Sequence, residues 1–219
     1  MKHRPTFRRV RALLVLAIIV PLAGCALQSQ QPASSTVNAS NKAQTFTSKQ
    51  YGFRISYPAD LALRQQPEPA YLLSDHWKLY ANTDAAPGQP VIALRLPASN
   101  KVAAAELRIG VSRDPASLRS CRGTPAATVP DSIGSTRIDG VTFTTFKARD
   151  AGMSHYMIVH GYRAVHNNTC YALDVIVYGT NPKVYDPPRT PPFSRQQAFA
   201  RLTPLATGLA FITPTASAQ

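Results

Sequence analysis

Three of the five histidines in this chain stand close together, at positions 155, 160 and 166. Imidazole groups can ligate zinc or transfer protons near neutral pH. The surrounding residues alternate as in a β-strand, so His155 projects from the opposite face to His160 and His166. The latter two share a face but lie about 20 Å apart at the rise of an extended strand. We therefore expect a core histidine at 160 and solvated ones at 155 and 166; a site at His160 completed from another strand is the alternative.

The residue combinations that mark hydrolases and nucleotide-binding enzymes do not occur in this sequence. It contains no Gly-x-Ser-x-Gly nucleophile motif and no glycine-rich phosphate loop. Most aspartates stand at turn or cap positions, where the carboxylate hydrogen-bonds the local backbone. Asp174 differs, because it lies within a strand pattern diagonally across from Arg163, and we expect these two to form an ion pair. The sequence predicts no catalytic residues, no metal site and no cofactor.

The first of the three cysteines follows an export signal. Residues 1–24 have the basic start, the apolar stretch and the small-residue end of a signal peptide. Its end, Leu22-Ala23-Gly24-Cys25, resembles the lipobox of bacterial lipoproteins. This resemblance implies cleavage before Cys25 and lipidation with palmitate or a similar chain, which would anchor the protein without a spanning helix. Ordinary secretory cleavage, with Cys25 a chance residue, is the alternative.

The net charge and the residue that follows Cys25 limit the kinds of binding partner and the location to expect. The chain carries 24 Lys+Arg against 11 Asp+Glu, and removing residues 1–24 leaves 19 against 11, a net charge of +8. The arginines are scattered rather than clustered, which argues against nucleic acid. Ala26 follows Cys25, where Asp would resemble an inner-membrane retention signal, so we expect the periplasmic face of the outer membrane. The expected partners are membrane lipid through Cys25 and an envelope protein or cell-wall polymer.

The two remaining cysteines, Cys121 and Cys170, form an even pair in an oxidising compartment. They are too far apart in sequence for a short zinc-binding motif, and two ligands are too few for structural zinc. The sequence predicts a structural disulfide between them.

The chain divides into four parts. Residues 1–24 are the signal peptide, and residues 25–45 are a lipidated cysteine followed by a polar, disordered tether. A globular domain is predicted over 46–212 and a disordered tail over 213–219. Strand patterns occupy 53–57, 91–96 and 107–112, helices begin after Asp114 and Ser194, and Asp139-Gly140 is a hairpin turn.

The strongest structural prediction is a hairpin from Met153 to Tyr178. With Asn167-Asn168 as its two-residue loop, Tyr162 pairs with Leu173. One face is then apolar and the other mixed, so both faces of the sheet should be covered. The sequence thus predicts an α+β fold, a largely antiparallel sheet with helices packed on both faces in an α/β/α sandwich.

The opening Tyr51-Gly52-Phe53-Arg54-Ile55-Ser56-Tyr57-Pro58, the hairpin ending Cys170-Tyr171-Ala172-Leu173 and the closing helix to Leu209-Ala210-Phe211 resemble PsbP-like domains. These domains occur in photosystem II extrinsic subunits and in bacterial lipoproteins. The resemblance spans most of 46–212 and implies scaffolding or assembly, with no catalytic residues to carry over. A photosynthetic role is not implied.

Two classes of function remain. The first is a membrane-anchored, non-catalytic binding or assembly module. The second is an envelope hydrolase acting on cell-wall or lipid substrates with an acid–base pair brought together from distant positions. For the binding module, the candidate surfaces are the aromatic stretch 71–80, with Trp77 and Tyr80 as binding residues if they are exposed, and the proline-rich connector 181–193.

Overall fold

The computed structural model describes residues 43–80 and 87–213. Its strands are β1 (Ala43–Ser48), β2 (Phe53–Pro58), β3 (Ala62–Arg64), β4 (Gln89–Arg95), β5 (Ala104–Ser112), β6 (Gly134–Ile138), β7 (Val141–Gly152), β8 (His155–His166), β9 (Thr169–Thr180) and β10 (Ala210–Phe211). Its helices are α1 (Pro115–Arg119) and α2 (Arg195–Thr207), with a 3₁₀ turn, η1, at Pro182–Val184. Strand β1 includes the last three residues of the predicted tether, whereas the signal peptide and Cys25 lie outside the described residues.

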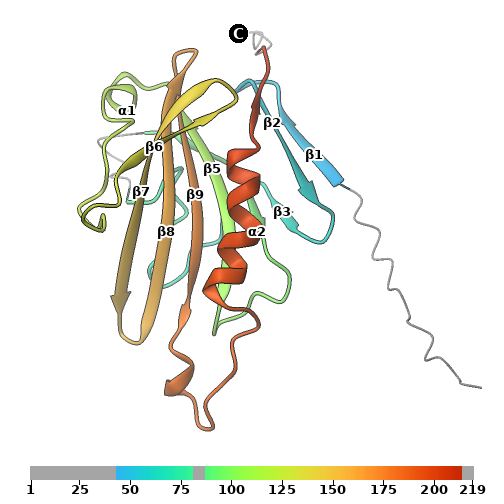
Figure 1. Cartoon of the computed structure of the whole chain (residues 1–219), viewed down its shortest axis with the longest axis vertical. Helices are drawn as coiled ribbons and strands as arrows, with labels where there is room; N and C mark the ends of the chain where they lie inside the picture. The colour runs from blue at the N-terminus through green and yellow to red at the C-terminus, as the bar shows by residue number, and fades with distance from the viewer. Residues whose placement is uncertain (1–42, 81–86, 214–219) are drawn as a thin grey trace, which may run out of the picture. The chain divides into compact units, whose positions relative to one another are not determined.

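Seven strands form one sheet in the order β3-β4-β5-β9-β8-β7-β6, and β1, β2 and β10 form a smaller sheet (Figure 1). Neighbouring strands pair antiparallel throughout the described residues. The three longest strands, β7, β8 and β9, have twelve residues each and lie side by side. The predicted largely antiparallel sheet is therefore confirmed.

The β8–β9 hairpin has the predicted register. Tyr162 pairs with Leu173, and Asn167 and Asn168 form the loop with φ values of 46° and 53°. Both angles lie in the left-handed region, which asparagine tolerates better than most residues and which the twist of a two-residue hairpin requires. Asp139 and Gly140 make the same kind of turn between β6 and β7. Local turn chemistry thus sets the register of the two hairpins.

One face of the large sheet is covered by α2 and by the small sheet. The packing of α2 against β9 and β5 is visible in Figure 1. Its buried residues Ala198, Leu202 and Ala206 share a hydrophobic cluster with Phe53 of β2 and Leu173 of β9. Ser194 caps the start of the helix, as the sequence predicted, and the structure shows that the cap is a capping box with Gln197. This side of the domain contains the largest of the three apolar clusters and carries the predicted closing helix, whereas the small sheet beside that helix was not predicted.

The other face does not carry the predicted helical layer. Helix α1 has only five residues, and the sheet is covered instead by the irregular segment 65–80, which we call the strap. Strap residues Leu73 and Leu79 pack in a second apolar cluster with Ile176 of β9. The prediction of helices on both faces was therefore wrong.

Buried charges on this face favour an irregular cover. Arg108 donates hydrogen bonds to the backbone carbonyls of Ser74 and Glu68, the latter at 2.7 Å, and a carboxylate oxygen of Asp174 accepts from Leu79 N at 3.1 Å. A helix uses its backbone groups internally and could not offer them to buried side chains. The backbone of an irregular segment can offer its N–H and C=O groups to these side chains, which explains why the strap covers this face.

The strap approaches the sheet most closely at Gly110 of β5. A Cβ atom on that residue would lie 1.7 Å from the carbonyl oxygen of Trp77, so any side chain would displace the strap. Glycine is thus required here by close backbone approach and not by its φ angle.

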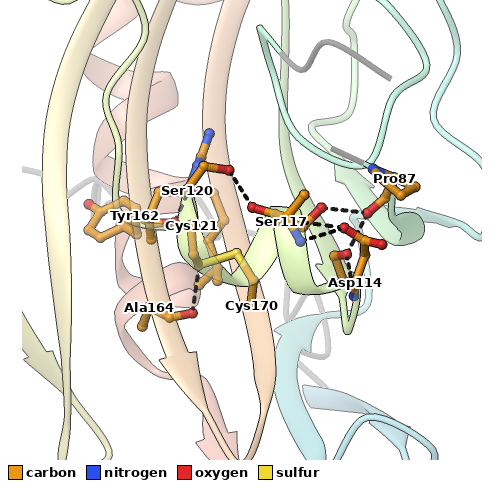
Figure 2. Close-up of a disulfide and its surroundings, with 12 residues drawn as sticks. Pro87, Asp114, Ser117, Ser120, Cys121, Tyr162, Ala164 and Cys170 are labelled. Carbon is orange, nitrogen blue, oxygen red and sulfur yellow. Dashed lines mark hydrogen bonds between the residues drawn. A yellow bond between two sulfur atoms is a disulfide. The ribbon is translucent and has the colours of Figure 1, made fainter. Parts of the chain in front are cut away.

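The predicted disulfide between Cys121 and Cys170 is confirmed (Figure 2). Both cysteines are fully buried, and they share a small cluster with Trp77 of the strap. Asp114 caps α1, because its carboxylate accepts hydrogen bonds from two backbone N–H groups of the first turn. The bridge joins the residue just after α1 to β9 and closes the second face of the sheet beside the strap.

Candidate functional site

The strap and one end of the large sheet form an open groove of about 570 Å³. Its walls come from the strap, from the turn between β4 and β5, from the start of β8 and from the end of β9. We call it the Tyr71 groove, and the lining residues that matter below are Glu68, Tyr71, Arg95, Lys101, His155, Tyr178 and Thr180. Segments that are distant in sequence therefore meet at one hollow in the surface.

An aromatic stack forms one side of this groove. The ring of Tyr71 lies 4.3 Å from the ring of His155, centroid to centroid, with only 21° between their planes. Tyr71 is 59% exposed, so its outer face is open to a ligand. The Nδ1 atom of His155 is in turn 3.3 Å from the Thr180 hydroxyl. The stack therefore holds the Tyr71 ring in place through its inner face and leaves its outer face exposed.

Two cationic side chains face the same hollow. Arg95 donates to the Tyr178 hydroxyl at 2.7 Å and lies 3.8 Å from a carboxylate oxygen of buried Glu106. Lys101 is exposed, and within residues 43–80 and 87–213 its ammonium group has no ion-pair partner. Burial, with the nearby charge of Glu106, raises the pKa of Tyr178 to about 12, which keeps this phenol neutral. The groove thus offers neutral aromatic surface beside positive charge.

The one carboxylate at the rim is already paired. Glu68 and Arg64 form an ion pair on the strap side, and the hydrogen bond from Arg64 lowers the pKa of this exposed Glu68. Because Glu68 is paired, Lys101 is the cation of the groove that has no carboxylate partner among the described residues, and Arg95 shares Glu106 with Arg108. Such a lining suits a partner that combines a flat or apolar element with a negative group.

The two aromatic residues proposed from sequence lie elsewhere. Trp77 is only 3% exposed and packs against the disulfide, with the Lys78 ammonium 4.9 Å from its ring. Tyr80 is half-buried, and burial followed by the charges of Asp150 and Asp174 raises its pKa to about 12. The exposure that a binding role at Trp77 requires is absent, and the exposed aromatic residue of this stretch is Tyr71. Nothing in the sequence around these residues distinguishes the exposed Tyr71 from the buried Trp77.

The other two histidines of the predicted strand lie on the α2 side. His160 is half-buried and stacks on Phe199 of α2 at 3.9 Å, and His166 is half-buried beside Phe211 at 4.4 Å. Burial, and then the charge of Lys147, lowers the pKa of His160 to about 4. Neither His155 nor His166 is the freely solvated residue that the sequence suggested, because each packs on an aromatic ring. Sequence reasoning placed all three on one strand but could not see these rings.

Two further observations concern the described residues alone. No helix in them is long and apolar enough to cross a bilayer. No group of three or more His, Cys, Asp or Glu side chains in them is arranged to hold a metal ion. Cys25, the predicted lipidation site, lies outside the part of the chain that the structure describes.

Comparison with known proteins gives structural neighbours only. The chain matches no family model, and no curated protein matches it. It is similar to the solution structure of cyanobacterial PsbP (CyanoP) from Synechocystis, with 10% identity and a TM-score of 0.43 over 78% of this chain and 93% of that one. A crystal structure from Bacteroides thetaiotaomicron is similar at 13% identity and a TM-score of 0.42, over 77% of this chain and 48% of that one, so this chain spans about half of that protein's length. Likeness at this level carries no conclusion about function.

Proposed function

We propose that this chain is a non-catalytic binding or assembly module of the bacterial envelope, held at the outer membrane by a lipid on Cys25. In this proposal the Tyr71 groove receives part of an envelope protein or cell-wall polymer. The observation that carries the proposal is the exposed Tyr71 ring, which is stacked on His155 beside Lys101, a cation with no ion-pair partner in the part of the chain that the structure describes. A ring that is already held in place loses little conformational freedom when a partner covers it, so more of the contact energy appears as affinity.

The lining also indicates the chemistry of the partner. Tyr71 offers a flat apolar surface, and Lys101 and Arg95 offer positive charge within the same groove. A peptide segment or a glycan with a carboxylate would use both features, because its apolar face would cover the ring and its charge would lie near the ammonium group.

The hydrolase alternative has one observation in its favour. The Thr180 hydroxyl lies 3.3 Å from His155 Nδ1 inside the groove, which is the arrangement of a nucleophile beside a base. A triad also needs a group that orients the imidazole, and the His155 ring contacts Tyr71 instead of a carboxylate within the described residues. We therefore favour binding. Ester or peptidoglycan hydrolysis that disappears in Thr180→Val, with the fold intact, would reverse this choice.

The binding proposal is tested by cross-linking in intact cells followed by recovery of the protein and its partners. Tyr71→Ala and Lys101→Glu should each reduce recovery of a common partner. Ile133→Ala is the matched control, because Ile133 is 60% exposed and does not line the groove. Equal recovery from all variants, or equal loss in the control, would refute the groove as the binding site.

A further inference from the structure

Exposed apolar side chains gather at one end of the domain. The described residues include four large hydrophobic side chains that are strongly exposed, namely Tyr71, Ile133, Met153 and Val184. Three of them lie at the end where β7 turns into β8. Tyr71 belongs to the groove, whereas Met153, at 80% exposed, and Val184, at 52%, do not line it. These two side chains are available to a different surface.

Met153 and Val184 belong to loops that are joined by hydrogen bonds. Met153 is in the β7–β8 turn, and the next residue, Ser154, accepts a hydrogen bond from Asn181 N at 2.8 Å. Asn181 accepts another from Val184 N at 3.2 Å. Figure 1 shows the β7–β8 turn and the connector after β9 at the same end of the sheet. We call this surface, formed by residues 149–154 and 181–189 with Arg195, the tip.

The tip is basic. Its exposed charged residues are Arg149, Lys183, Arg189 and Arg195 against Asp150 and Asp186. Arg149 and Arg195 line one shallow cavity of about 310 Å³ together with Asp150 and Tyr156, and the Arg195 guanidinium lies 4.8 Å from the Tyr156 ring. Two guanidinium groups around one hollow suit a phosphate-bearing headgroup.

We infer that the tip is a membrane-contact surface that docks on anionic phospholipid. Exposed aliphatic side chains enter the interface between headgroups and acyl chains, and Lys and Arg around them are attracted to anionic lipids. Basic residues alone do not define the surface, because Arg119 and Arg122 near α1 are exposed too. The tip differs in combining such charge with Met153 and Val184. This contact is independent of the groove partner and of the lipid on Cys25.

The test uses the full chain in a Cys25→Ser background, so that no acyl chain contributes. The confirmed disulfide leaves Met153→Cys as the only free thiol, and an environment-sensitive dye on it reports insertion. The dye should shift to shorter wavelength with phosphatidylglycerol vesicles and not with pure phosphatidylcholine vesicles. The same dye on Ile133→Cys should not shift, although Ile133 is also strongly exposed, at 60% against 80% for Met153.

Charge reversal gives the second arm. Lys183→Glu with Arg149→Glu should weaken binding to the anionic vesicles by at least about fivefold per residue, whereas Arg119→Glu with Arg122→Glu should leave the signal at position 153 unchanged. No shift at 153, an equal shift at 133, or an equal effect of the control reversal would overturn the inference. A photo-cross-linker at position 153 that captures a protein in place of lipid in cells would overturn it as well.

Discussion

Arg163 and Asp174 form an ion pair inside the domain, with side chains that are each 2% exposed. The Arg163 guanidinium reaches both carboxylate oxygens, at 2.8 and 3.1 Å, and also donates to the carbonyls of Tyr162 and Leu173. Asp174 in turn accepts from the strap at Leu79 N. Because every partner is buried, the pair orders the sheet and the strap together, and removing one member leaves the other without compensation.

We predict that Asp174→Ala lowers the free energy of unfolding by about 3–5 kcal/mol, because it leaves buried Arg163 unpaired. The matched control is Asp60→Ala, which breaks the exposed pair between Asp60 and Arg201 and should cost less than about 1 kcal/mol. Urea denaturation measures both variants. Similar losses would mean that burial does not set the strength of these pairs.

His160 gives the domain a predictable pH dependence. Its pKa falls from 6.5 to about 4 on folding, chiefly through burial, so the unfolded chain binds more protons between these values. Its neutral form therefore contributes stability above about 6.5 that is lost as the pH falls toward 4. His160→Phe retains a ring against Phe199 and cannot be protonated. We expect its melting temperature to fall less than that of the wild type over this pH range, and equal slopes would contradict the assignment.

At the scale of elements, the disulfide and the strap form one unit around Trp77. We predict that Cys121→Ala with Cys170→Ala lowers stability by about 2–5 kcal/mol. Trp77 is the only tryptophan of the chain, so its fluorescence reports this unit alone. The double variant should shift its emission to longer wavelength while the far-ultraviolet circular dichroism of the sheet persists. Unchanged emission, or two free thiols in the wild-type protein by mass spectrometry, would refute the coupling.

The elements that could be predicted are those determined by residues close together in the sequence. Asn167-Asn168 and Asp139-Gly140 set hairpin registers through their own backbone angles, and Asp114 and Ser194 cap helices through contacts a few residues away. The Arg163–Asp174 pair followed from the register. The hydrophobic period of a strand or helix and the residues of a tight turn can be recognised in a single sequence, because both depend on residues that are close together along the chain.

The strap and the groove depend on contacts between distant segments. Nothing around Trp77 indicates that its carbonyl meets Gly110, or that Arg108 offers hydrogen bonds to the backbone of Glu68 and Ser74. A strand face with both polar and apolar residues predicts that another segment packs on it, but it does not show whether that segment is a helix or a loop. Likewise, Tyr71 and His155 could not be paired from sequence, although the aromatic stretch 71–80 did contain the exposed ring.

For the whole molecule, we propose that a lipid on Cys25 anchors the folded domain to the membrane. We predict that Cys25→Ser abolishes palmitate labelling and moves the protein out of the lipid-anchored membrane fraction, because the lipid attaches to that sulfur. Fractionation and labelling in growing cells measure both effects. Cys121→Ala with Cys170→Ala is the control for loss of any other cysteine, and palmitate labelling that persists in Cys25→Ser would exclude the anchor.

We propose that the Tyr71 groove is the surface at which this module binds its partner. A photo-reactive amino acid placed at position 71 in intact cells, compared with the same residue at position 133, tests it most directly, since both sites are about equally exposed. We predict one discrete cross-linked partner from position 71 that is lost when Lys101→Glu is added, and none from position 133. The same products from both positions, or none from position 71, would show that the groove is not the partner-binding site.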